Sequence, residues 1–171
     1  MTQHTLLLGH TLQFSGNPLS QAWEDAVSID SAGGVLIKDG HIVAVGSADA
    51  LRKAHPDAQI TDYGDALICP GFVDAHAHYP QTAIIASWGK RLIDWLNRYT
   101  FPEEMRLSDP DYATQIAGRY LDLTLAHGTT TVCSYTTIAP HSVDAIFDAA
   151  ATRDQRIVAG KTCMDRNAPD G

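Results

Sequence analysis

Segments of strand character alternate with segments of helix character from Ala66 onward, and this alternation constrains the fold more than any other feature. The order is strand, helix, strand, helix, strand, over residues 66–78, 108–128, 129–135, 142–153 and 156–164. Ser108 or Asp109 can cap the first helix, and Gly128 can end it in the left-handed conformation. Strands that alternate with helices form right-handed βαβ units, so the sequence predicts an α/β fold with a parallel sheet.

Two histidines, His76 and His78, stand at the carboxyl end of the first predicted strand. Residues i and i+2 of a strand project to the same face, so both imidazoles could bind one divalent metal ion. Functional groups also gather at the carboxyl ends of parallel strands. With eight histidines among 171 residues, however, roughly 0.4 such pairs are expected by chance. The pattern by itself leaves two interpretations open, a metal site or a coincidental pair in the core.

The first part of the chain, residues 1–65, has the character of a small β domain. Two strand-like runs, 35–38 and 41–45, flank Asp39 and Gly40, a dipeptide typical of a two-residue type I′ turn. Further elements are expected as short strands over 5–8, 12–14 and 59–63 and a short helix over 47–53. After these elements the sequence becomes continuously apolar over residues 66–69, which predicts a domain boundary between residues 65 and 66.

The composition excludes several classes of protein. Twelve basic and twenty acidic residues give a net charge of -8 without a basic cluster, which disfavours nucleic-acid binding. The apolar runs are shorter than the ~18–20 residues that span a bilayer, and the N-terminus lacks the pattern of a secretory signal. Cys69, Cys133 and Cys163 are odd in number and far apart, as expected of reduced, mostly buried thiols. We therefore expect a cytoplasmic protein that binds neither nucleic acid nor membranes.

The segment around the two histidines resembles the first-strand signature of the amidohydrolase superfamily. It reads Pro-Gly-Phe-Val-Asp-Ala-His-Ala-His over residues 70–78. The hairpin residues 38–42 resemble the small β domain that precedes the barrel in this superfamily. Four further stretches are similar to one branch, the guanine deaminases: residues 78–81, 95–103, 127–131 and 160–165. The run Tyr-Thr-Phe-Pro-Glu at 99–103 and the position of Gln81 are what narrow the resemblance to that branch.

For the fold, the resemblance implies a (β/α)8 TIM barrel preceded by a small β-sandwich-like domain. Residues 1–65 would be half of a composite sandwich, and residues 66–171 would supply about three strands of the barrel. A complete barrel takes about 250 residues. The chain is therefore expected to be the N-terminal portion of a longer enzyme, incomplete by itself.

For the activity, the resemblance implies zinc-dependent hydrolysis of guanine to xanthine and ammonia. His76 and His78 are expected to be ligands of one zinc ion per active site, and Gln81 is expected to bind the purine base. The other metal ligands and a proton-shuttling glutamate are expected beyond Gly171, so no catalytic acid or base is assigned within this chain. The complete enzyme is expected to be a homodimer.

Other residues near these positions receive structural interpretations. Asp74 is expected to share a face with the histidine pair and to support it indirectly. Trp88 and Trp95 lie at near-helical spacing with leucines, which favours a place in the core over contact with substrate. Asp165 and Asn167 are candidate loop contacts at the end of the third strand.

Two alternatives to a guanine deaminase remain open. One is another deaminase or a chlorohydrolase of the same superfamily that acts on a related heterocycle. The other is a non-catalytic, metal-binding fragment. A histidine at the end of a later strand and an aspartate near the last strand would decide for the enzyme, while the choice between zinc and iron stays open.

Overall fold

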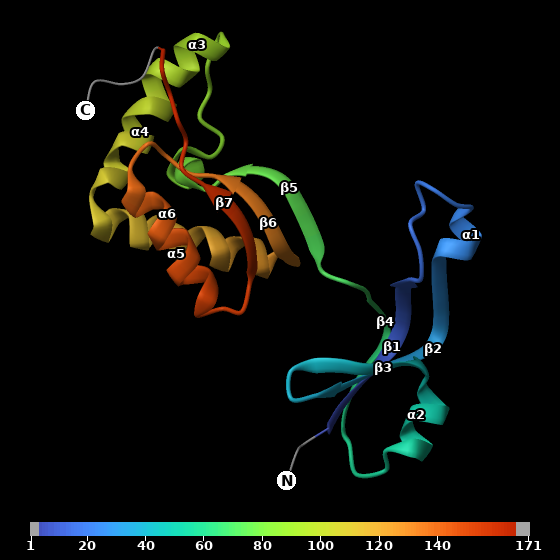
Figure 1. The fold of residues 1–171 in the computed structure, drawn as a ribbon. Helices are drawn as coiled ribbons and strands as arrows, with labels where there is room; N and C mark the ends of the chain where they lie inside the picture. The colour runs from blue at the N-terminus through green and yellow to red at the C-terminus, as the bar shows by residue number, and fades with distance from the viewer. Residues whose placement is uncertain (1–3, 167–171) are drawn as a thin grey trace. The chain divides into compact units, whose positions relative to one another are not determined.

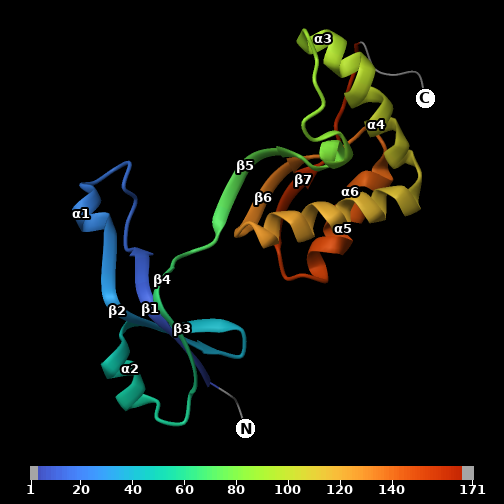
Figure 2. The same ribbon diagram turned by 180° about the vertical axis from the view of Figure 1, so that it is seen from behind.

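A computed structural model describes residues 4–166 and divides the chain into two compact units, Met1–Pro70 and Gly71–Gly171 (Figures 1 and 2). The fold is mixed α/β, as predicted, but the boundary between the units lies later than residue 65. The reason is that the run Ala66–Ile68 does not begin the parallel sheet. It pairs with the first strand of the chain instead, with Leu67 beside His10 and Ile68 beside Thr11.

The first unit is a four-stranded sheet with two short helices. Its elements are β1 (His4–Phe14), α1 (Trp23–Ala26), β2 (Val27–Lys38), β3 (His41–Ser47), α2 (Ala48–Ala54) and β4 (Gln59–Ile68). The strand order is β3-β2-β1-β4, in which β1 is antiparallel to β2 and parallel to β4. Buried leucines of β1, β2 and α2 form its core: Leu6, Leu8, Leu36 and Leu51.

The β2–β3 hairpin forms as the sequence predicts. Lys38 pairs with His41 across the turn, and both central residues have positive φ, 50° at Asp39 and 77° at Gly40. A type I′ turn requires positive φ at both positions, and its twist matches that of the flanking strands. The helix expected from residue 47 is also present as α2, with Ser47 at its N-cap position.

The second unit carries the parallel sheet. Its strands are β5 (Phe72–His78), β6 (Thr129–Tyr135) and β7 (Arg156–Gly160), in that order across the sheet. The connection from β5 to β6 holds η1 (Tyr79–Ile84), α3 (Leu92–Trp95), η2 (Leu96–Thr100), α4 (Phe101–Met105), η3 (Arg106–Ser108) and α5 (Pro110–Ala126). The connection from β6 to β7 holds α6 (Pro140–Ala151). The predicted alternation of three strands and two longer helices is confirmed.

Local signals explain where α5 begins and ends. The Asp109 side chain accepts a hydrogen bond from the backbone N–H of Asp111, 2.9 Å away, and so caps the helix. Pro110 occupies the first turn, where its missing N–H costs nothing. Gly128 follows the helix with φ 81°, a left-handed conformation that glycine adopts without strain.

Helices α5 and α6 pack against one face of the parallel sheet (Figures 1 and 2). The buried side chains of this layer include Ile116 and Leu121 of α5, Val132 of β6 and Ile146 of α6. None of the helices formed by residues 4–166 is long and apolar enough to cross a membrane.

The prediction that the cysteines are mostly buried is wrong. Cys69, Cys133 and Cys163 are free, but all three are exposed. Cys133 lies between the buried Val132 and Ser134 of β6, so its side chain projects from the sheet face opposite to the helices. Within residues 4–166 this second face carries exposed apolar side chains, among them Val73 and Val158, because α5 and α6 cover the other side.

Candidate functional site

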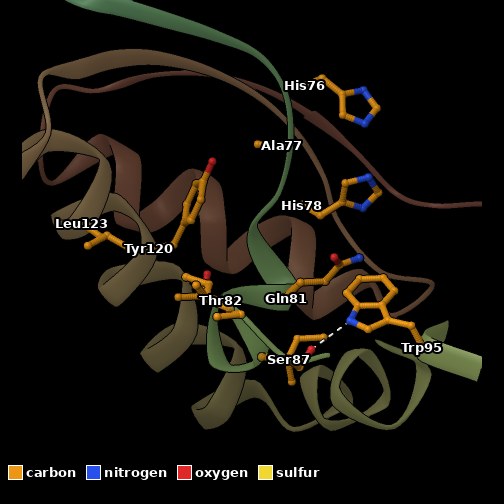
Figure 3. A pocket seen from close by; sticks show the side chains of 12 residues that line it. His76, Ala77, His78, Gln81, Thr82, Ser87, Trp95, Tyr120 and Leu123 are labelled. Atoms are coloured by element: carbon orange, nitrogen blue, oxygen red, sulfur yellow. Dashed lines mark hydrogen bonds between the residues drawn. The ribbon is translucent and has the colours of Figure 1, made fainter. Parts of the chain in front are cut away.

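His76 and His78 lie at the carboxyl end of β5, with both side chains on the same side of the strand (Figure 3). Ala77 between them packs against the helix-covered core, so the two imidazoles face the opposite way and are exposed. Their ring centroids are 5.4 Å apart. The structure therefore places the two histidines together, as their spacing predicts.

The separation of the imidazoles suits two ligands of one metal ion. With Zn–N bonds of about 2.0–2.1 Å and tetrahedral angles, two coordinated imidazoles have ring centres about 5 Å apart. Burial, followed by the neighbouring His76, lowers the pKa of His78, which favours the neutral imidazole that binds metals. No group of three or more His, Cys, Asp or Glu side chains that could hold a metal forms within the described part of the chain.

Tyr135, at the end of β6, contacts both imidazoles. It lies beside His78 in the sheet, and the two rings stack with centroids 4.8 Å apart and an interplanar angle of 22°. Its centroid is 5.5 Å from that of His76, in an edge-on arrangement. Sequence analysis missed this residue, although the predicted end of the second strand at residue 135 was a signal for it. The aromatic ring restricts the orientations open to both histidines.

Buried polar contacts hold the chain in place just after His78. The backbone N–H of Tyr79 donates a hydrogen bond to Ser134 Oγ, 3.0 Å away on β6. The Tyr79 hydroxyl donates to the backbone carbonyl of Ser142 at the start of α6. The Tyr79 side chain is fully buried, and this burial raises the pKa of its phenol. The end of β5 is thereby tied to both β6 and α6.

Asp74 does not share a face with the histidine pair, so that prediction is wrong. The register of β5 against β6 shifts between Asp74 and Ala77, and Asp74 lies beside the buried Val132. Residues opposite each other in neighbouring strands project to the same face, so Asp74 points to the helix side. Burial and then the Asp74 charge raise the pKa of Tyr120, on α5, to about 12. The Asp74 carboxylate also accepts a hydrogen bond from the backbone N–H of His76, 3.1 Å away.

Gln81 lies in η1, just beyond the histidine pair, and its side chain is half-buried. Its amide Nε2 donates a hydrogen bond to Glu104 Oε1 of α4, 3.0 Å away. Burial raises the pKa of Glu104, and the bond from Gln81 opposes that shift. Sequence analysis missed Glu104, because the stretch that it compared with the guanine deaminases ended one residue earlier.

A cavity of about 330 Å3 lies beside the histidine pair and Gln81. His76, His78, Gln81 and Trp95 line it, and in Figure 3 Gln81 lies between His78 and Trp95. The Trp95 indole N–H donates a hydrogen bond to Ser87 Oγ, 2.9 Å away, which fixes the ring at the cavity wall.

The prediction that Trp88 and Trp95 lie in the core is wrong. Trp88 is 74% exposed, and Trp95 is half-buried at the cavity. The helical spacing that suggested core packing is interrupted, because residues 85–91 do not form a helix and α3 begins only at Leu92. Asp165 is exposed beyond β7, whereas Asn167 lies outside the described residues.

Residues 67–171 match the amidohydrolase family. This chain belongs to the amidohydrolase family. A second match, over residues 33–58, is to the imidazolonepropionase-like composite domain of bacteria. The family match covers β5, β6 and β7 and includes the histidine pair and Gln81.

Relatives of this amidohydrolase include guanine deaminases. The chain is 43% identical over 137 residues to the guanine deaminase of Escherichia coli K12. This alignment covers 80% of this chain and 31% of that relative. The structure of guanine deaminase from Bradyrhizobium japonicum superposes with a TM-score of 0.89 at 35% identity, covering 98% of this chain and 36% of the other. Guanine deaminase from C. acetobutylicum, solved with guanine bound in its active site, gives a TM-score of 0.81 at 29% identity, covering 98% and 38%. The chain thus spans about a third of the length of these proteins.

Proposed function

We propose that this chain is the N-terminal portion of a zinc-dependent guanine deaminase. The observation that carries the proposal is the meeting of His76, His78 and Gln81 on one cavity wall at the carboxyl end of β5. Two imidazoles suit a divalent metal, and a side-chain amide suits the hydrogen-bonding edge of a purine. The relatives named guanine deaminase support the choice of guanine as the substrate.

For the architecture, we propose that β5, β6 and β7 are the first three strands of a (β/α)8 barrel. The parallel order, the helices on one face and the functional groups at the carboxyl ends support it. The first unit would be half of a composite β-sandwich domain, which the match of residues 33–58 to a composite domain supports.

In the proposed reaction, guanine and water give xanthine and ammonia. When bound, zinc would lower the pKa of a water molecule to about 7, which supplies a hydroxide nucleophile at neutral pH. His76 and His78 would coordinate the metal through ring nitrogens, and Tyr135 would restrict the orientation of both imidazoles. Gln81 would bind the base at the cavity wall and so hold the carbon that bears the amino group close to the attacking water.

The test is deamination of a panel of bases by the full-length protein, measured as ammonia release. We expect guanine to be turned over in preference to adenine, cytosine and adenosine. Faster turnover of a pyrimidine or a triazine would assign the enzyme to another deaminase or chlorohydrolase branch. Absence of turnover together with retained zinc binding would favour the non-catalytic alternative.

Replacement of Gln81 tests the substrate site itself. Gln81→Ala removes one hydrogen-bonding partner of a buried base, which costs ~1–3 kcal/mol. The expected kcat/KM for guanine therefore falls about 5- to 150-fold. Gln115→Ala is the matched control, because Gln115 is an exposed glutamine of α5 and does not line the cavity. Equal kcat/KM values for the two variants would contradict the role of Gln81.

The resemblance has further implications that stay predictions. Zinc as the native metal, a homodimer as the assembled state and a cytoplasmic enzyme of purine catabolism all extend the proposal.

A further inference from the structure

We propose that Glu104 orients the side-chain amide of Gln81, so that the carbonyl oxygen Oε1 is the atom offered to the substrate. This inference rests on the proposed substrate-binding role of Gln81 and assigns a positioning residue to that site. It also predicts which kind of group on the base is recognised, namely an N–H donor.

The contact between the two side chains determines the orientation. A glutamine amide can face a ligand with either its N–H2 group or its carbonyl oxygen, since rotation by 180° exchanges the two. An ionised carboxylate only accepts hydrogen bonds. Gln81 must therefore turn Nε2 toward Glu104 Oε1, 3.0 Å away, and this leaves Oε1 on the other side of the amide. Among the described residues, none donates a hydrogen bond to Gln81 Oε1.

The position of Glu104 shows that this carboxylate is not simply a solvated surface charge. It borders a small cavity together with Phe101, Ile138 and Met164, and this partial burial raises its pKa. A partly buried carboxylate needs a hydrogen-bond donor, and Gln81 supplies it.

The neighbouring glutamate serves a different purpose. Glu103 is buried and accepts hydrogen bonds from Arg106 Nη1, at 2.9 Å, and from the Tyr112 hydroxyl. It therefore ties α4 to η3 and to the first turn of α5 without touching Gln81. The two adjacent carboxylates offer a matched pair for mutagenesis, one beside the substrate residue and one in a purely structural contact.

The chemical consequence is a preference for bases that present an N–H at this position. A guanine ring carries such donors, both on ring nitrogens and on its amino group. An analogue whose facing N–H is methylated or replaced by an acceptor nitrogen would leave Oε1 unpaired or repelled, at a cost of ~1–3 kcal/mol.

The experiment compares Glu104→Gln with Glu103→Gln in the full-length protein. A glutamine at position 104 can donate or accept, so it no longer dictates the orientation of Gln81. We expect Glu104→Gln to raise KM for guanine about 5- to 20-fold while kcat changes by less than about twofold. Glu103→Gln should lower thermal stability and leave KM unchanged. A KM for Glu104→Gln within twofold of the wild-type value would overturn the inference.

A double mutant separates positioning from general structural damage. If Glu104 acts through Gln81, then Glu104→Gln should add less than about twofold to KM when Gln81→Ala is already present. Effects that multiply in the double mutant would mean that Glu104 acts by another route and would refute the proposal.

A readout independent of activity distinguishes failure of this inference from failure of the proposed function. In protein labelled with 15N-glutamine, the Gln81 side-chain amide signal is identified by its loss in Gln81→Ala. We expect that signal to shift in Glu104→Gln and not in Glu103→Gln, whether or not guanine is a substrate. An unchanged signal in Glu104→Gln overturns the inference, whereas a shifted signal without any turnover of guanine overturns the proposed function alone.

Discussion

Ser134→Ala should weaken zinc binding at the proposed metal site, although Ser134 is not one of the proposed ligands. Ser134 is 3% exposed on β6, and its hydroxyl accepts the backbone N–H of Tyr79, the residue directly after His78. The same hydroxyl donates to the backbone carbonyl of Tyr135, 3.0 Å away. Alanine leaves the Tyr79 N–H buried without its partner, and an unsatisfied buried donor costs ~1–3 kcal/mol.

That cost sets the expected size of both measurable effects. The free energy of unfolding of the zinc-free full-length protein should fall by ~1–3 kcal/mol in urea denaturation. The strand end that carries His78 can move to expose the unsatisfied N–H of Tyr79 to water. If the whole cost then appears in metal binding, the dissociation constant for zinc should rise about 5- to 150-fold. Competition with a chromophoric chelator measures that constant directly.

The control is Thr114→Ala. Thr114 is exposed on α5, and its hydroxyl donates to the backbone carbonyl of Pro110, 2.9 Å away, far in sequence from the histidines. Such an exposed substitution should change stability by no more than ~0.5 kcal/mol. The reasoning is refuted if Ser134→Ala unfolds like this control and also binds zinc with wild-type affinity.

Three further predictions follow from the same structure. His76→Ala and His78→Ala should each lose zinc in metal analysis of the purified full-length protein. His127→Ala should retain it, because His127 is an exposed residue at the C-cap of α5 and does not line the cavity. Wild-type zinc content in both His76→Ala and His78→Ala would contradict the assignment. Residues 1–171 expressed alone should aggregate, or should associate with the remainder of the proposed enzyme when that part is added, because exposed apolar side chains on the open sheet face would meet water. A monomer in sedimentation that melts cooperatively would contradict this. Burial raises the pKa of Glu104, so the stability that its protonated form contributes is present at low pH and is lost as the pH rises through the folded-state pKa. Glu104→Gln should therefore gain stability relative to wild type in urea unfolding as the pH rises from the acid range to neutrality, and a pH-independent difference would argue against a raised pKa.

The elements that could be predicted from sequence are those whose causes lie within a few residues. The type I′ turn needs only Asp39 and Gly40, which tolerate positive φ. The start of α5 needs only the carboxylate of Asp109 and the proline after it. The i, i+2 spacing of His76 and His78 likewise brings two imidazoles to one side of a strand end.

Predictions that depended on register or on partners distant in the sequence were less successful. Asp74 was assigned to the wrong face because the register shift in β5 is a property of its pairing with β6, which strand periodicity does not encode. The run Ala66–Ile68 was assigned to the wrong sheet because its apolar character suits both β4 and a barrel strand.

By itself, therefore, the sequence determined the order of elements, the parallel sheet and the histidine pair, because turns, caps and strand alternation act locally. The tertiary structure decided what surrounds that pair. Tyr135 reaches the imidazoles from β6, and Glu104 reaches Gln81 from a helix more than twenty residues away along the chain. Such contacts arise only when separate segments pack side by side, since no local rule specifies which side chains then meet.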